Sequence, residues 1–212
     1  MFPAQSRLTA THSQTRSVVR GPDRVGLVGF HDTGFVIAWP THAHDAALQK
    51  RVQRLHDQIG SLTNITAGIR TAITLLRPAP FTVLRRVWLL SDGEPNCEVG
   101  AIESVVAQAR RAYVNINTIG FGDSYNEQVL RRISAGTHRG QFVSVQSLRQ
   151  LVDVLVRNSG GPVGGSRHRS EATVIAIDLS ASMREPMEGR TKIAVVQEAI
   201  LQLLLYKQQV FA

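Results

Sequence analysis

The feature that most constrains the fold is a short apolar run that ends in three oxygen-bearing side chains. Residues 173–177 read Thr-Val-Ile-Ala-Ile, and Asp178, Ser180 and Ser182 follow at alternate positions. A run this short, rich in β-branched residues and apolar on both faces, is typical of a central strand in a parallel sheet. The alternation directs three oxygen ligands from one turn toward one place, which suits a hard cation such as magnesium. The stretch therefore predicts a cation site at a strand end.

Two further stretches supply oxygen-bearing partners for this site. Asp92 follows a second apolar run, residues 86–91, and Thr63 lies in a polar loop that opens a helix. Taken alone, Asp92 would be interpreted as a turn or cap residue, and either Thr63 or Asn64 as an ordinary helix N-cap. Three oxygen-bearing clusters at the ends of such elements favour one shared site instead.

The combination of D-x-S-x-S, a threonine in a loop before a helix and an aspartate after an apolar strand resembles the metal-ion-dependent adhesion site of the von Willebrand factor type A family. The resemblance implies that Ser180, Ser182 and Thr63 bind the cation directly, while Asp178 and Asp92 hold its waters and supply charge. It implies Mg²⁺, or Mn²⁺ or Ca²⁺ in its place. With few anionic ligands the metal stays electrophilic, so it would take a carboxylate of a protein partner as its last ligand.

The order of the motifs differs from that of the family, in which the D-x-S-x-S strand comes first. The resemblance covers nearly the whole chain from about Asp23 if residues 173–208 are moved in front of residue 23. The sequence is therefore identified as a circularly permuted member of the family. The predicted fold class is α/β, with a doubly wound, Rossmann-like, mostly parallel six-stranded sheet and helices on both faces.

The rest of the chain alternates strands and helices, as such a fold requires. Two apolar runs around a tight turn near residues 31–34 predict an antiparallel hairpin. Periodicity predicts helices over residues 45–59, 65–76, 101–113, 126–135, 147–157 and 191–207, and strands over 114–119 and 141–145. In the family, the D-x-S-x-S strand lies between the hairpin and the Asp92 strand, which is the switch point where ligands of open α/β sheets bind.

We predict one domain over residues 23–212 and a disordered tail over residues 1–22, although a transit peptide would share the tail's composition. Residues 158–171 are glycine-rich and predict a flexible connector that joins the ancestral ends. The strand and helix after this connector cannot bury a core alone, so they must dock into the earlier part of the chain or into a second copy. The connector's reach favours a monomer over a domain-swapped dimer.

Composition narrows the choice of partner and compartment. The net charge of +8 would suit nucleic acid, but the arginines are scattered and no recognition motif accompanies them, so we predict no nucleic-acid partner. Cys97 is the single cysteine, which excludes an intramolecular disulfide and suits a cytoplasmic location. Polar residues interrupt the most apolar segment, so we predict no membrane span.

These observations predict a metal-dependent protein-interaction module of the adhesion or scaffold type rather than an enzyme. One alternative is a magnesium-dependent phosphohydrolase, because haloacid-dehalogenase-like enzymes also place an aspartate after an apolar strand. Those enzymes need a second acid two residues further on, where this chain has Ser180, and no glycine-rich phosphate loop is present. A metal-independent scaffold is the other alternative, against which the complete five-residue set argues.

Overall fold

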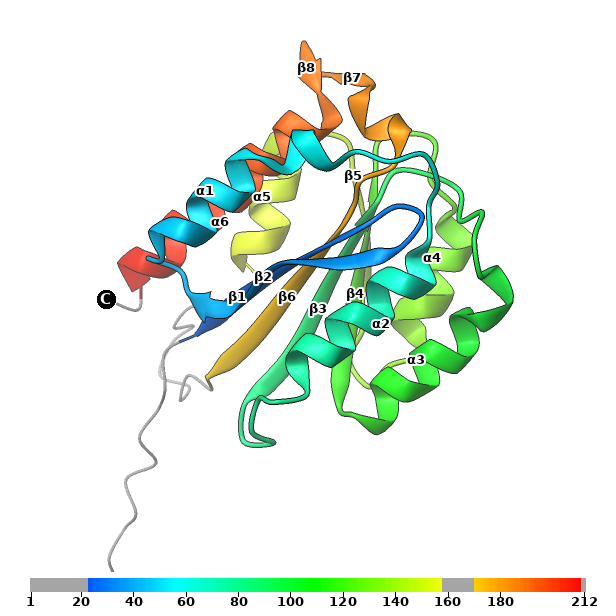
Figure 1. Cartoon of the computed structure of the whole chain (residues 1–212), viewed down its shortest axis with the longest axis vertical. Coiled ribbons are helices and arrows are strands. Elements are labelled where there is room, and N and C mark those ends of the chain that lie inside the picture. Colours follow the sequence, from blue (N-terminus) through cyan, green and yellow to red (C-terminus); the bar gives the residue numbers. More distant parts are fainter. Residues whose placement is uncertain (1–22, 158–169, 211–212) are drawn as a thin grey trace, which may run out of the picture.

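A computed structural model describes residues 23–157 and 170–210 of the chain, which form a six-stranded sheet covered by helices on both faces (Figure 1). The strands are β1 (Arg24–Phe30), β2 (Gly34–His42), β3 (Leu84–Ser91), β4 (Val114–Phe121), β5 (Phe142–Val145) and β6 (Glu171–Asp178). Their order is β2-β1-β6-β3-β4-β5, and only the edge strand β2 runs antiparallel to its neighbour. The predicted α/β class with a mostly parallel six-stranded sheet is confirmed.

Two helical layers enclose two separate apolar cores. The helices are α1 (Ala46–Gln53), α2 (Ile65–Leu76), α3 (Ile102–Arg111), α4 (Glu127–Ala135), α5 (Leu148–Arg157) and α6 (Lys192–Val210). Figure 1 shows α1, α5 and α6 on one face and α2, α3 and α4 on the other. Alternation along β3 divides its side chains accordingly, since Trp88 packs with the first layer and Val87 and Leu89 with the second.

The strand from the C-terminal part of the sequence lies at the centre of the sheet. All eight residues of β6 are buried, and the strand pairs in parallel with β1 on one side and β3 on the other. Helix α6 then covers the sheet through a buried stripe that includes Val196, Ile200 and Leu203. The insertion of this strand between the hairpin and the Asp92 strand is as the sequence predicted.

The structure corrects two predicted boundaries. The helix predicted over residues 45–59 ends at Gln53, and a separate 3₁₀ turn, η1 (Leu55–Gln58), follows it. Arg54 leaves the α conformation, and the tighter turn places the fully buried Leu55 in the core beside α6.

The second correction concerns the start of β6. The predicted connector, residues 158–171, reaches one residue too far, because Glu171 already belongs to β6 and the carbonyl of Ser170 accepts a 2.9 Å hydrogen bond from the Leu84 N–H. The remainder of that connector and the predicted tail, residues 1–22, lie outside the described residues.

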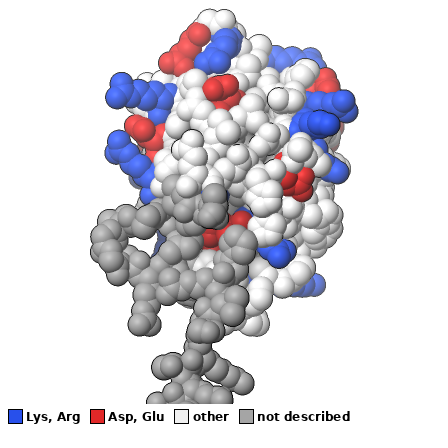
Figure 2. Space-filling view, turned by 90° about the vertical axis from the view of Figure 1, so that its left-hand side faces the viewer, with Lys and Arg blue, Asp and Glu red and all other residues white. Residues whose placement is uncertain are grey.

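Charged side chains of both signs are mixed on one face of the molecule. On the face that Figure 2 shows, lysine and arginine side chains are interspersed with acidic ones instead of forming one basic track. A continuous basic track is what a phosphate backbone would need. None of the helices in the described part of the chain is long and apolar enough to cross a membrane.

Candidate metal site

The candidate site lies where the winding of the sheet reverses. Strand β6 ends at Asp178 and continues to α6 on one face, whereas its neighbour β3 ends at Ser91 and continues through Asp92 to α3 on the other face. Both aspartates are fully buried. The two carboxylates therefore sit at the carboxyl edge of adjacent parallel strands, in the crevice that such a reversal opens.

Hydroxyl groups link the loops after these two strands. The Oγ atoms of Ser180 and Ser182 are 3.0 Å apart, and the Ser182 hydroxyl donates a 2.8 Å hydrogen bond to Asp92 Oδ1. The Ser180 N–H donates to Asp178 Oδ1 over 3.0 Å, which closes the turn that directs these side chains to one side. The structure thus joins Ser182 of D-x-S-x-S directly to Asp92 and Ser180 to it through Ser182.

Thr63 reaches the same place from the loop before α2. A Cβ built on Gly93 would stand 3.5 Å from Thr63 Oγ1 and 3.7 Å from Ser182 Oγ, so the bare glycine keeps open the space that these two hydroxyls face. Asn96 holds the threonine's backbone, because its Oδ1 accepts from the Thr63 N–H and its own N–H donates to the Thr63 carbonyl.

The hydrogen bonds of the neighbouring residues distinguish Thr63 from Asn64 and Thr66. Asn64 is the N-cap of α2 and accepts from the Ala67 N–H over 3.0 Å, which leaves Thr63 free of the capping role that the sequence left open. Thr66 instead donates its hydroxyl to the Glu98 carbonyl over 3.0 Å. Thr63 Oγ1 has no hydrogen-bond partner within residues 23–157 and 170–210.

Asp178 is buried and accepts hydrogen bonds from a hydroxyl and from a backbone amide. The Ser91 hydroxyl donates a 2.6 Å hydrogen bond to its Oδ2. Burial raises the pKa of Asp178 to about 7, and the charge of Asp92 adds to the rise, although the hydrogen bonds from Ser91 and Ser180 oppose it. Ser91 was not a predicted site residue, and its only signal in the sequence is a polar side chain at the end of an apolar strand.

A lysine that the sequence analysis missed completes the site. Lys192, the first residue of α6, is buried and donates to Asp92 Oδ2 over 2.8 Å and to Glu185 Oε2 over 2.6 Å. Burial lowers the pKa of Lys192, but its hydrogen bonds and ion pairs with Asp92 and Glu185 outweigh burial and hold the pKa above its usual value. The ammonium therefore neutralises one of the two buried carboxylates.

Glu185 belongs to a small hairpin beside the site, β7 (Pro186–Met187) and β8 (Arg190–Thr191), that the sequence analysis did not predict (Figure 1). Its turn residues, Glu188 and Gly189, have φ angles of 50° and 75°, as in a type I′ turn. The Glu188 carboxylate accepts from the Leu148 N–H at the start of α5 over 2.9 Å, which anchors the hairpin tip.

The donor set fits a hard cation. It consists of hydroxyl and carboxylate oxygens, with Thr63 Oγ1 left without a partner, and oxygen ligands are those that Mg²⁺, Mn²⁺ and Ca²⁺ prefer. Within the described residues, no group of three or more His, Cys, Asp or Glu side chains is placed to hold a metal ion. A cation here would therefore depend on neutral hydroxyls.

Comparisons with known proteins identify a family. The sequence model of the von Willebrand factor type A domain matches residues 10–157, a stretch that contains Thr63 and Asp92 and ends before β6. Among solved structures, an uncharacterised membrane-spanning protein from Vibrio fischeri is 23% identical over 64% of this chain and 74% of its own, with a TM-score of 0.32, too low to support an argument. No curated protein matches the chain.

Proposed function

Because the chain belongs to the von Willebrand factor type A domain family, whose members are protein-interaction modules in general, we propose that it binds a protein partner through a divalent cation held at the carboxyl edge of the sheet. The cation is Mg²⁺, with Mn²⁺ or Ca²⁺ as substitutes. The observation that carries the proposal is the meeting of three loops, after β6, before α2 and after β3, around the hydroxyls of Ser182 and Thr63.

The hydrogen bonds suit the division of roles that the resemblance implies. Ser180, Ser182 and Thr63 bind the cation directly, while Asp178 and Asp92 orient its waters and supply charge. The Ser182 hydroxyl donates its hydrogen to Asp92 and accepts one hydrogen bond from Ser180, so one lone pair remains for a cation. Asp92 and Asp178 each have both oxygens engaged by donors, which suits outer carboxylates better than direct ligands.

Lys192 reduces the negative charge at the candidate site. Its ammonium offsets the charge of Asp92, and the raised pKa of Asp178, about 7, leaves that carboxyl about half protonated near pH 7 and so reduces its negative charge. A cation among these groups meets little negative charge, so it binds modestly and remains electrophilic. The carboxylate of a partner protein then supplies the missing negative ligand.

We also propose that the unusual order of the motifs is a circular permutation. Strand β6 and helix α6 provide the central strand and its covering helix, yet they follow the segment that matches the family. The monomer is the proposed state, with a strand-exchanged dimer as the alternative. Light scattering at low concentration distinguishes the two states.

The site gives less support to the phosphohydrolase alternative. A nucleophilic aspartate must reach the phosphorus atom of its substrate, whereas Asp178 is fully buried and both of its oxygens accept hydrogen bonds from within the chain. A phosphatase assay with magnesium that compares the wild type with Asp178→Asn tests this alternative directly.

The central experiment is a Mn²⁺ titration followed by electron paramagnetic resonance, which reports bound metal without any partner. Thr63→Val should lose most of the binding, because it removes one direct ligand without changing the side chain's shape. Thr66→Val is the matched control, since Thr66 donates to Glu98 and should retain the wild-type affinity. Equal losses in the two variants, or wild-type affinity in Thr63→Val, would contradict the proposed ligand set.

A further inference from the structure

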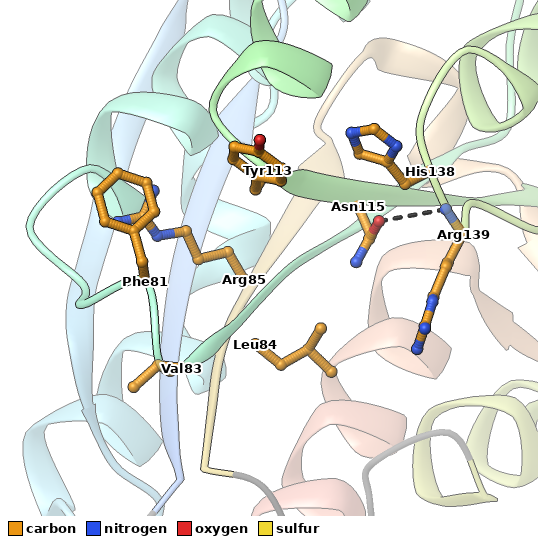
Figure 3. A pocket seen from close by; sticks show the side chains of 8 residues that line it. All are labelled: Phe81, Val83, Leu84, Arg85, Tyr113, Asn115, His138 and Arg139. Carbon is orange, nitrogen blue, oxygen red and sulfur yellow. Dashed lines mark hydrogen bonds between the residues drawn. The ribbon is translucent and has the colours of Figure 1, made fainter.

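A cavity lies at the opposite edge of the sheet from the candidate metal site. It has a volume of about 360 Å³ and is formed where β3 and β4 begin, together with the loops before β3 and β5 (Figure 3). This is within the size range of small-ligand sites. The residues that matter for its chemistry are Phe81, Arg85, Tyr113, Asn115, His138 and Arg139, and we call it the basal pocket.

The basal pocket contains a buried positive charge without a negative partner. Arg85 is 6% exposed, and its guanidinium is held by the carbonyls of Ala112, at 3.0 Å, and Ala79. Its Nε–H is the only buried side-chain polar atom without a partner in the described part of the chain. No acid lines the pocket, and neither Arg85 nor Arg139 forms an ion pair within that part. The guanidinium also lies over the Phe81 ring, 4.4 Å from the ring centroid. A buried cation without an acidic partner favours an anion in its neighbourhood.

The other polar groups of the pocket are also donors. Asn115 uses its Oδ1 to accept a 3.2 Å hydrogen bond from the Arg139 N–H, which the dashed line in Figure 3 marks. The amide nitrogen of Asn115 therefore remains available as a donor. With the guanidinium of Arg139 alongside, the lining offers hydrogens to a ligand rich in acceptors.

Aromatic rings form the outer wall of the pocket. Tyr113 stacks on His138 with 5.6 Å between ring centroids and 15° between planes, and Phe81 meets Tyr113 edge-on at 6.4 Å. The Tyr113 and Phe81 side chains are nevertheless 66% and 73% exposed. Such rings give a flat surface against which a planar group can pack.

The backbone at Tyr113 adopts a conformation that is unfavourable for a bulky residue. Tyr113 follows α3 and has a φ angle of 54°, the left-handed conformation that glycine or asparagine adopts at helix ends with little strain. A bulky residue in this conformation costs stability, and such strain is concentrated at functional sites. Here it positions an exposed ring at the mouth of a cationic pocket.

We propose that the basal pocket binds a small ligand that combines a planar ring with a carboxylate or phosphate group. The ring packs against Tyr113 and Phe81, and the anionic group accepts hydrogen bonds from Asn115 and Arg139. The buried charge of Arg85, whose guanidinium lies over the Phe81 ring, attracts the anion at longer range. The proposal is independent of the metal site, because the two sites lie at opposite edges of the sheet.

Binding is tested by isothermal titration of the full chain with benzoate, phenyl phosphate, benzyl alcohol, benzylamine and inorganic phosphate, all with EDTA present. Benzoate or phenyl phosphate should bind about tenfold more tightly than benzyl alcohol, because hydrogen bonds to a charged group are the stronger ones. The stronger of the two identifies the anionic group. Inorganic phosphate should bind more weakly than phenyl phosphate, and benzylamine should not bind. Equal binding of benzoate and benzylamine would overturn the proposal.

Three variants separate the pocket from the general charge of the surface. Arg139→Gln and Tyr113→Gly should each weaken binding of the tighter anion about fivefold or more, and both remain folded because Arg139 is exposed and glycine relieves the strain at position 113. Arg131→Gln is the matched control, since Arg131 lies over the Phe142 ring at 4.4 Å, outside the pocket. Unchanged binding in Tyr113→Gly, or an equal loss in the Arg131→Gln control, would refute the site.

Discussion

The carboxyl and amino edges of the sheet, where the parallel strands end and begin, differ in how their buried charges are balanced. At the carboxyl edge, Asp92 is paired with Lys192, and Asp178 is held by Ser91 and by the Ser180 amide. At the amino edge, Arg85 has carbonyl partners and no counter-charge within the described residues. A buried charge that is already paired within the protein does not need a bound ligand to balance it. A buried charge without a counter-charge favours binding of a ligand of opposite charge. The metal site can therefore keep its shape without metal, while the basal pocket is electrostatically incomplete.

The largest effect is expected from breaking the ion pair between Lys192 and Asp92 at the carboxyl edge. Lys192→Met leaves Asp92 buried without its cation and should lower the free energy of unfolding by about 3–5 kcal/mol in the presence of EDTA. Urea denaturation measures this loss. Because Mg²⁺ can replace the lost charge, added Mg²⁺ should stabilise the variant more than the wild type. A loss below about 1 kcal/mol would show that Asp92 does not depend on Lys192.

The next effect concerns pH. Folding raises the pKa of Asp178 from 3.8 to about 7, so the folded protein holds a proton between these values that the unfolded chain has released. The folded state is then stabilised at the acidic end, and the contribution of Asp178 falls as the pH rises from about 4 to about 7, by about 4 kcal/mol in all.

Asp178→Asn removes this titration and tests its sign. Without metal, the free energy of unfolding of the variant should fall less between pH 5 and pH 8 than that of the wild type, because the contribution of Asp178 is absent. Urea denaturation at the two pH values measures this difference. Ser144→Ala, on edge strand β5, is the control and should keep the wild-type slope. Superimposable pH profiles for Asp178→Asn and the wild type would rule out Asp178 as the source.

A smaller effect compares two residues with positive φ: Tyr113, whose ring stacks on His138, and Glu188, whose carboxylate accepts from the Leu148 N–H. Tyr113→Gly should raise the free energy of unfolding by about 1 kcal/mol, because glycine adopts a positive φ without a steric penalty. Glu188→Gly relieves a similar φ of 50° but removes the hydrogen bond to the Leu148 amide, so its net gain should be less. Thermal unfolding of both variants decides, and a larger gain at position 188 would contradict the comparison.

The smallest change in stability is expected for Gly93→Ala, which should nevertheless weaken metal binding. Gly93→Ala places a methyl group 3.5 Å from Thr63 Oγ1 and 3.7 Å from Ser182 Oγ, which is ordinary van der Waals contact. The free energy of unfolding should therefore change by less than about 0.5 kcal/mol. The methyl group occupies the space that the hydroxyls face, so Mn²⁺ should bind more weakly. Wild-type Mn²⁺ affinity would place the cation elsewhere.

The sequence could predict the fold because local patterns and the rules of parallel sheets agree. The apolar run before Asp178 needs a neighbour on both sides, and Asp92 ends the other run of that kind, so both had to meet at one edge. The choice of Thr63 over Thr66 also followed from its place in the loop before α2. These are features of a few adjacent residues.

What the sequence could not show depends on contacts between distant residues. Lys192 is an ordinary polar residue at a helix start until the fold places Asp92, a hundred positions earlier, beside its ammonium. Arg85 likewise precedes an apolar run without indicating that its guanidinium is buried. The positive φ of Tyr113 is equally hidden, because tyrosine is not a turn-forming residue.

The central position of β6 also determines how the chain can fold as it is made. The ribosome synthesises β6 after the other five strands, and its partners lie far back in the chain, with Leu84 opposite Glu171 and Arg24 opposite Ala172. Until β6 emerges, the inner edges of β1 and β3 remain unpaired and open to association with other nascent chains. The sheet therefore closes late and as a unit, with the slow kinetics of long-range pairing, and a chaperone that shields these two edges would assist it most.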